Sequence, residues 1–264
     1  MILSELEAVI ESEAVSGNLS RLISDKVSLS SQITYLNTSA TRHKMYLLEE
    51  KGRRYIVRAE PAKETLPGVD PLRERVILNA ISSFDWAPKL LINEPHQGVL
   101  IMNHAGDCKE SQSPVQKAIL IKALIEMQCL TDLPQLDYAT LFQQYRDEMS
   151  DSGHRQLIDE TEQQLNSLAD LPKVLVHHDL HPGNVCWQND LPTIIDWEYA
   201  GVGIAWLDYA VLVRDLGFTA MELMQFPLLR HFNEQELTHE LAQSIQVIDQ
   251  IEMLWAHYKL NVTG

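Results

Sequence analysis

Residues 174–200 constrain the fold and chemistry of this chain more than any other stretch. They read VLVHHDLHPGNVCWQNDLPTIIDWEYA, in which polar loops separate short apolar runs. Three such runs, each typical of a strand, occupy residues 174–176, 185–187 and 193–195. Asn189-Asp190, followed by Pro192, predicts a turn, so two of these strands should form a hairpin.

Asp179, Asn184 and Asp196 flank these strands and could lie at one end of the hairpin. Two carboxylates and an amide oxygen suit a hard divalent cation that also binds phosphate oxygens. The same groups suit the positioning of a hydroxyl for phosphoryl transfer.

The composition predicts a globular protein. The chain has 264 residues, enough for two lobes, and 45% of them are hydrophobic. No apolar run is long enough for a membrane span, and the acidic N-terminus does not resemble a signal peptide, so we expect a cytoplasmic protein. A net charge of −16 disfavours nucleic acid and anionic membranes as partners. This charge is compatible with a cationic substrate, although it can equally serve solubility.

Cysteine usage supports a reducing compartment. The three cysteines, Cys108, Cys129 and Cys186, are far apart and form neither a CxxC pair nor a disulfide framework. We therefore expect three partly buried thiols.

The order of elements predicts an α+β fold. Strands are expected at 27–36, 44–48, 53–59, 89–92 and 99–102, with one helix at 71–81. A helix is also expected at 3–9, and helices dominate after Asn103, where the stretch described above interrupts them. These patterns predict a small antiparallel sheet with one helix in residues 1–103 and a larger, mainly helical part in residues 104–264.

A histidine cluster offers one alternative. His177, His178 and His181 surround Asp179, and His177 and His181 have the spacing of helical zinc ligands. Pro182-Gly183 disfavours a helix there, and His178 stands where a metalloprotease has glutamate. A looser zinc site remains open as a minor alternative.

The motif His177-x-Asp179-x-His181-x-x-Asn184, with Asp196 at the end of a following strand, resembles the catalytic core of the aminoglycoside phosphotransferase and choline kinase superfamily. The segment IDWEYA, residues 195–200, resembles the choline, ethanolamine and thiamine kinases in particular. This resemblance implies a two-lobed, protein-kinase-like fold and an enzyme that uses ATP and Mg²⁺.

The resemblance also implies residue roles. Asp179 would accept or orient the proton of the substrate hydroxyl, and Asn184 and Asp196 would hold Mg²⁺. His177 would brace the loop, and Glu198 would be a second metal ligand or a substrate contact. Asp208 matches an aspartate that supports the catalytic loop in the family.

The N-terminal part would bind the nucleotide. Arg58 lies on the strand where kinases place a phosphate-binding lysine, and Glu74 would be its ion-pair partner. Met102 and His104 lie in the expected hinge, residues 101–104, whose backbone would meet adenine. The loop 36–42 lacks the glycines of most kinases, although Thr38, Ser39 and backbone amides can still meet phosphate.

Aromatic residues indicate the acceptor. A quaternary ammonium or thiazolium group would be stabilised by aromatic faces and carboxylates. The candidate contacts are Glu198, Trp197, Tyr199, Trp255 and Tyr258. We therefore expect a kinase of a small cationic alcohol such as choline or thiamine. The alternatives are an aminoglycoside or sugar phosphotransferase and a catalytically weak nucleotide-binding relative.

Overall fold

The structure is a computed structural model, and it describes residues 32–36, 44–59, 66–109, 112–149 and 151–263. The expected helix at 3–9 and the residues Thr38 and Ser39 lie outside these ranges. The described chain groups into two compact units, one from residues 1–65 and 88–105 and the other from 66–87 and 106–264. The boundary expected after Asn103 stays a prediction.

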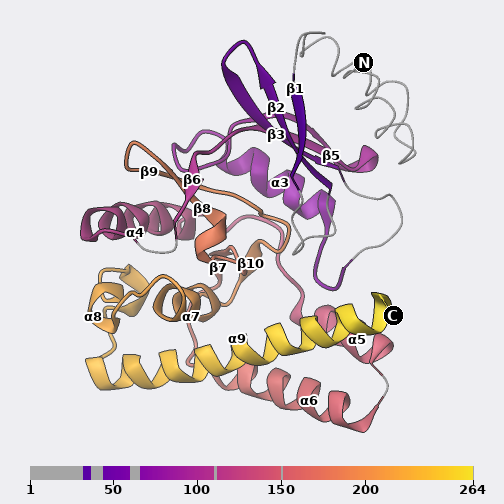
Figure 1. Ribbon diagram of the computed structural model, residues 1–264. Helices are drawn as coiled ribbons and strands as arrows, with labels where there is room; N and C mark the ends of the chain where they lie inside the picture. The colour runs from indigo at the N-terminus through magenta and orange to yellow at the C-terminus, as the bar shows by residue number, and fades with distance from the viewer. Residues whose placement is uncertain (1–31, 37–43, 60–65, 110–111, 150, 264) are drawn as a thin grey trace. The chain divides into compact units, whose positions relative to one another are not determined.

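The first unit is built on a five-stranded antiparallel sheet in the order β1-β2-β3-β5-β4 (Figure 1). The strands are β1 (Gln32–Leu36), β2 (Lys44–Glu50), β3 (Arg53–Ala59), β4 (Leu90–Glu94) and β5 (Val99–Asn103), with a short 3₁₀ turn η1 (Pro95–Gln97) between the last two. Glu50-Lys51-Gly52 is a tight-turn signal in the sequence, and Lys51 and Gly52 both have positive φ, the geometry of a tight hairpin. One face of the sheet forms a core that includes Leu48, Val57 and Ile101.

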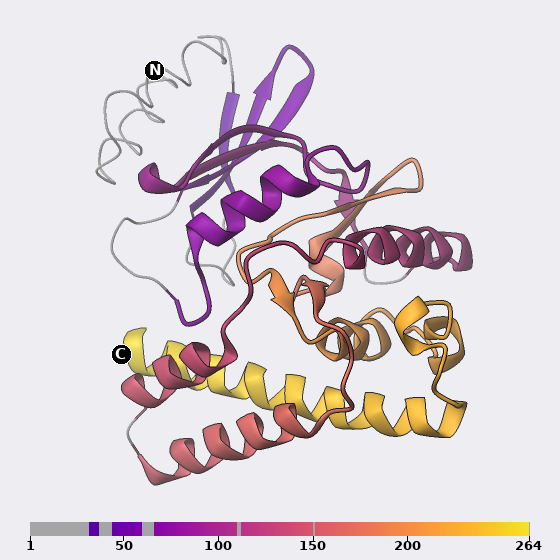
Figure 2. The same cartoon turned by 180° about the vertical axis from the view of Figure 1, so that it is seen from behind.

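The second unit contains the helices α3 to α9 (Figure 2). They are α3 (Pro71–Ile81), α4 (Pro114–Gln128), α5 (Tyr138–Glu148), α6 (Ser152–Ser167), α7 (Trp206–Arg214), α8 (Ala220–Leu223) and α9 (Glu234–Thr263). The long helix α9 packs along α6 and α7 and also contacts α5 and α8. This helix therefore links four of the other helices of the second unit.

Within its described residues, the second unit also contains five short strands. They are β6 (Asp107–Cys108), β7 (Val174–Val176), β8 (Val185–Gln188), β9 (Leu191–Ile194) and β10 (Gly201–Gly203), and two 3₁₀ turns are η2 (Pro182–Asn184) and η3 (Pro227–Leu229). β8 and β9 form the expected hairpin, and its turn residues Asn189 and Asp190 both have positive φ. β7 pairs with β10 instead.

Helix α3 groups with the second unit, although the sequence predicts it within the small sheet domain. The reason is local packing: Trp86, just beyond the helix, stacks on Trp197 at 5.8 Å, and its carbonyl accepts from Ile194 N at 2.9 Å. Apolar periodicity in the sequence predicts Leu72, Val76, Leu78 and Ile81 as the buried side of α3, and this prediction is partly wrong. Leu72 and Val76 are exposed, whereas Arg73 and Glu74 are buried.

The expectation of three free thiols is wrong. Cys108 and Cys186 form a disulfide between β6 and β8, where they stand directly opposite each other. Their separation of 78 residues concealed this register in the sequence. Cys129 is free and exposed.

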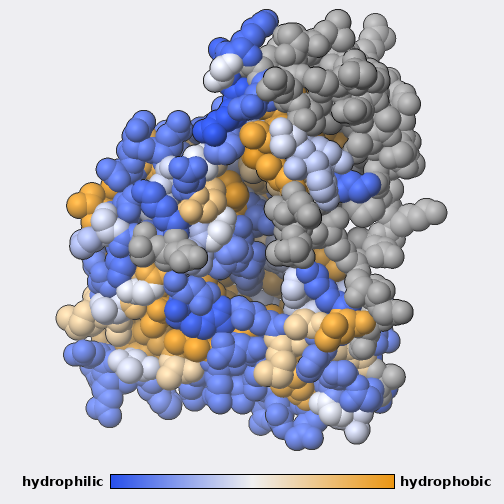
Figure 3. Space-filling view, in the orientation of Figure 1, coloured by the Kyte–Doolittle hydropathy of each residue, from blue (hydrophilic) through white to orange (hydrophobic). Residues whose placement is uncertain are grey.

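The face of the second unit seen in Figure 3 is largely hydrophilic, with separate hydrophobic areas. Among the described helices, none combines the length and apolar character that crossing a membrane requires.

Candidate active site

Residues 177–184 form the loop that the sequence predicts to be catalytic, called the catalytic loop below. It begins where β7 ends and is anchored by Asp208 in the first turn of α7. Asp208 Oδ2 accepts from His177 N at 2.9 Å, and Oδ1 accepts from His178 N at 3.0 Å. Burial raises the pKa of Asp208 to about 6, so this carboxyl is largely ionised at neutral pH. A buried carboxylate thus fixes the start of the loop through two charge-assisted hydrogen bonds.

His177 joins the loop to the strand that precedes Asp196. Its ring is fully buried and packs edge-on against Trp197 at 4.8 Å. Asp179 N donates to Nδ1 at 3.3 Å, so Nε2 carries the proton and donates to Ile195 O at 2.9 Å. Burial lowers the pKa of His177 to about 4, and the neutral ring can therefore keep both bonds at neutral pH.

Asp179 is held by Asn184. The Asn184 amide Nδ2 donates to Asp179 Oδ2 at 2.9 Å and to the Asp179 carbonyl at 2.8 Å. His181 Nε2 lies 3.7 Å from Asp179 Oδ2. These bonds fix the direction of a carboxylate whose side chain keeps 37% of its surface exposed.

The charge around Asp179 is strongly negative. Partial burial, together with the carboxylates of Asp196 and Glu198, raises the pKa of Asp179 to about 8, whereas the hydrogen bond from Asn184 lowers this pKa. Carboxylates that raise one another's pKa are stabilised by a cation bound among them. The donor set therefore fits a divalent cation.

Asp196 follows β9 in a left-handed conformation, with φ of 64°. Such a backbone costs a non-glycine residue about 1–3 kcal/mol and persists only where its surroundings fix it. Ile195 N donates to Asn184 O at 2.9 Å, and Trp197 Nε1 donates to Ile194 O at 2.8 Å. Hydrogen bonds on both sides thus hold Asp196 in this conformation.

Asn184 and Asp196 fit the expected magnesium ligands in their chemistry. The two side-chain bonds of Asn184 use Nδ2, so its amide oxygen is the atom suited to a cation. Within the described ranges, no three His, Cys, Asp or Glu side chains form a metal-binding group. A site of one or two carboxylates completed by an amide, water and phosphate is consistent with this result.

The zinc alternative gains no support from the histidines. His177 Nε2 is bonded to Ile195 O, and His178 Nε2 is 2.7 Å from the Tyr138 hydroxyl. Both rings therefore support the structure of the loop, and His181 lies near the Asp179 carboxylate.

The expected acceptor residues separate into a half-buried pair, Tyr199 and Trp255, and a buried group. Trp255 Nε1 donates to the Tyr199 hydroxyl at 3.1 Å, and the Lys259 ammonium lies 3.8 Å from the centre of the Trp255 ring. Trp197 is 1% exposed and Tyr258 is 6% exposed, so both belong to the core in this conformation. Glu198 is also buried, yet it acts electrostatically on Asp179.

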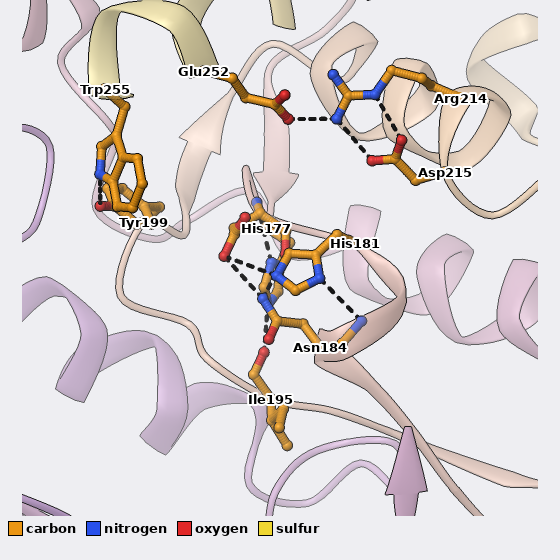
Figure 4. A network of polar contacts seen from close by, with 11 residues as sticks. His177, His181, Asn184, Ile195, Tyr199, Arg214, Asp215, Glu252 and Trp255 are labelled. Atoms are coloured by element: carbon orange, nitrogen blue, oxygen red, sulfur yellow. Dashed lines mark hydrogen bonds and ion pairs between the residues drawn. The ribbon is translucent and has the colours of Figure 1, made fainter. Parts of the chain in front are cut away.

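A further pair, Arg214 and Glu252, is missing from the sequence-based prediction. Arg214 binds Asp215 through two hydrogen bonds, Asp249 at 2.8 Å, and Glu252. Glu252 contributes to the raised pKa of Asp179, which places its charge near the catalytic loop. Figure 4 shows the loop residues between Ile195 on one side and the pairs Arg214–Glu252 and Tyr199–Trp255 on the other. Only the fold of α9 brings Glu252 there, so no local motif could reveal it.

The residues that the sequence predicts to bind the nucleotide belong to both units, and each is described within its own unit. Arg58 on β3 is buried and stands opposite Leu100, and Met102 on β5 stands opposite Ile56. His104 N donates to Arg54 O at 2.9 Å, which extends the sheet towards the expected hinge. Glu74 is buried on α3 in the second unit. The Arg58–Glu74 ion pair stays a prediction.

The antiparallel sheet, the helical unit and the loop anchored by Asp208 define a protein-kinase-like fold, as the sequence predicts. The profile of the phosphotransferase enzyme family matches residues 36–226, more than half of the chain. The chain belongs to this family, and the family resemblance is confirmed.

Solved structures agree on the fold. Choline kinase LicA from Streptococcus pneumoniae is 19% identical with a TM-score of 0.65, covering 92% of this chain and 91% of its own. A choline/ethanolamine kinase family protein from Mesorhizobium loti is 16% identical with a TM-score of 0.68, covering 97% and 86%.

The aminoglycoside enzyme APH(2")-IIa, solved with streptomycin and ATP, is 15% identical with a TM-score of 0.60, covering 90% and 93%. No curated protein sequence gives a significant match. At these identities the solved structures establish the fold alone.

Proposed function

We propose that this protein transfers the γ-phosphate of ATP to the hydroxyl of a small cationic alcohol, with choline or thiamine as the first candidates. The observation that supports this proposal best is the Asp179 carboxylate, fixed by Asn184 beside the carboxylates of Asp196 and Glu198. Membership of the phosphotransferase family supports the same reaction class.

Residues of the catalytic loop and of its surroundings have separate tasks in this mechanism. Asp179 orients the acceptor hydroxyl and takes its proton as the oxygen attacks the γ-phosphorus, and the bond from that phosphorus to the leaving oxygen of ADP breaks. Asn184 and Asp196 hold Mg²⁺, and His177 and Asp208 keep the loop in place. When bound, Mg²⁺ neutralises charge on the phosphates in the transition state.

The nucleotide is bound by the first unit. Arg58, paired with Glu74, binds phosphate oxygens, and the hinge around Met102 and His104 contacts the adenine. Thr38 and Ser39 in the glycine-free loop supply hydroxyl groups and amides to phosphate. A structure of LicA with AMP shows that a protein of this fold binds an adenine nucleotide.

The acceptor is bound by carboxylates and aromatic rings near Asp179. Glu198 and Glu252 supply negative charge, and the hydrogen-bonded rings of Tyr199 and Trp255 supply a polarisable surface. This combination favours a cationic alcohol over a neutral sugar. The negative net charge of −16 is consistent with such a substrate and with the proposed cytoplasmic location.

An ATP-consumption screen tests the proposal. The purified protein, with Mg²⁺, is compared with Asp179→Ala on choline, ethanolamine, thiamine, aminoglycosides and simple sugars. We expect turnover on a cationic alcohol that disappears in the variant. Near-full activity of Asp179→Ala on the best acceptor would refute the assignment.

Two alternatives correspond to other outcomes of this screen. Turnover only on an aminoglycoside would identify the chain with that branch of the family, which the similarity to APH(2")-IIa allows. Nucleotide binding without turnover on any acceptor would favour a non-catalytic relative. This alternative is based on the absence of glycine from the loop 36–42.

A further inference from the structure

Arg73 connects helix α3 to the segment that follows Asp196. Its Nε donates to Ala200 O at 2.8 Å, and one terminal nitrogen donates to Glu198 O at 3.3 Å and to Gly68 O. The residue is buried and lies 127 positions from Ala200 in sequence. These three acceptors are backbone carbonyl oxygens, so the Arg73 side chain constrains the backbone at these positions.

The segment 195–200 is held by different elements on its two sides. Before Asp196, the catalytic loop bonds Ile195 through His177 and Asn184. After Asp196, the Arg73 guanidinium bonds the carbonyls of Glu198 and Ala200. Asp196 lies between these two anchors with φ of 64°, a conformation that depends on such support.

We propose that Arg73 is a positioning residue that fixes the backbone of residues 198–200 and thereby directs the carboxylates of Asp196 and Glu198. This inference rests on the proposed function for the role of those carboxylates. Arg73 touches neither nucleotide nor acceptor in this scheme. A guanidinium suits the task because its rigid fork can reach several carbonyls at once, which a lysine ammonium does not reproduce.

The test compares Arg73→Gln and Arg73→Lys with Arg75→Gln, which removes the same charge from the same helix. The first readout is amide hydrogen exchange of the metal-free protein. Ala200 N and Val202 N are hydrogen-bonded to Trp197 O and Pro134 O, both at 3.0 Å, so their protection reports on this segment. We expect exchange about 10-fold faster in both Arg73 variants and unchanged in Arg75→Gln.

The second readout is Mn²⁺ binding, a paramagnetic probe for Mg²⁺, to the protein with a non-hydrolysable ATP analogue. Loss of an outer support for metal ligands lowers metal affinity by about 10-fold or more. We expect this loss in both Arg73 variants, with the affinity for the analogue in the absence of metal unchanged. A merely destabilising substitution would change the melting temperature and leave the Mn²⁺ affinity of the folded protein intact.

Several outcomes would overturn the inference. If amide exchange and Mn²⁺ affinity in Arg73→Gln equal those of the wild type, the backbone of residues 198–200 does not depend on Arg73. If Arg73→Lys has the exchange rates and Mn²⁺ affinity of the wild type, the positive charge is sufficient and the forked guanidinium group is not required. If Arg73→Gln does not fold, Arg73→Lys, which keeps charge and length, decides by the same readouts. If the wild type lacks turnover on every acceptor, the proposed function fails, while the exchange comparison still decides whether Arg73 positions the segment.

Discussion

Asn184 donates one hydrogen bond to the side chain of Asp179 at 2.9 Å and another to its carbonyl at 2.8 Å. The amide therefore fixes both the backbone and the carboxylate of the proposed catalytic base. Its oxygen is left for a cation, so a single residue can couple the direction of Asp179 to metal binding.

The substitution Asp179→Asn should separate activity from stability. Removal of the base should lower kcat by about 10²–10⁴-fold. The folded protein keeps the Asp179 proton up to a pKa of about 8, whereas the ordinary value is 3.8. Unfolding therefore releases a proton between these values, and the free energy of unfolding falls as pH rises through them.

The metal-free variant should accordingly become more stable than the wild type as pH rises, with the largest difference above about pH 8. Thermal melts at several pH values measure this effect, and Asp132→Asn, a change at an exposed aspartate, is the control. A constant difference in melting temperature across the range would contradict the raised pKa.

The substitution Asp208→Asn should destabilise the protein by about 2 kcal/mol, since an amide accepts from only one of the two backbone N–H groups and leaves the other buried. Both donors, His177 N and His178 N, begin the catalytic loop. We therefore also expect kcat to fall. Denaturant titration measures the stability, again with Asp132→Asn as the control, and a loss below about 0.5 kcal/mol would argue against the anchor.

The variants Asp196→Gly and Asp196→Ala should differ in their free energy of unfolding. Both substitutions remove the proposed metal ligand and should abolish turnover. Because φ is 64°, glycine adopts the backbone without a Cβ penalty, whereas alanine retains it. We expect Asp196→Gly to be about 1 kcal/mol more stable than Asp196→Ala. Equal denaturation midpoints would indicate that the left-handed backbone is not retained in solution.

Glu252 should influence the KM for a cationic acceptor. Neutralisation by Glu252→Gln should raise this KM about fivefold, with kcat and the KM for ATP unchanged, since an exposed charge interaction contributes about 1 kcal/mol. Arg214→Gln keeps the Glu252 carboxylate but removes the guanidinium group that binds it, so this variant should raise the KM by a smaller factor. An unchanged KM in both variants would favour a neutral acceptor such as a sugar.

The thiol count should distinguish the cysteine pair from free thiols. Denatured protein prepared without reductant should show one reactive thiol, Cys129, and reduction should reveal the remaining two, Cys108 and Cys186. Cys129→Ser should show none before reduction. Three thiols without reductant would restore the sequence-based expectation.

Local sequence was sufficient for much of the fold. The bounds of α3 and β7 match the expected 71–81 and 174–176, and the turns at Lys51-Gly52 and Asn189-Asp190 follow from turn chemistry. The prediction was wrong for the exposed side of α3, because apolar periodicity does not reveal that Arg73 is buried among carbonyl groups.

The sequence by itself determined the family, the order of β1 to β5 and α3, and the loop that carries Asp179 and Asn184 together with the hairpin that precedes Asp196, because these depend on residues close together in the chain. The tertiary structure alone decided which distant groups support that loop. Arg73 binds carbonyls more than 100 residues away, α7 and α9 bring Arg214 to Glu252, and strand register pairs Cys108 with Cys186. Such partners are set by packing between elements, and no local pattern encodes them.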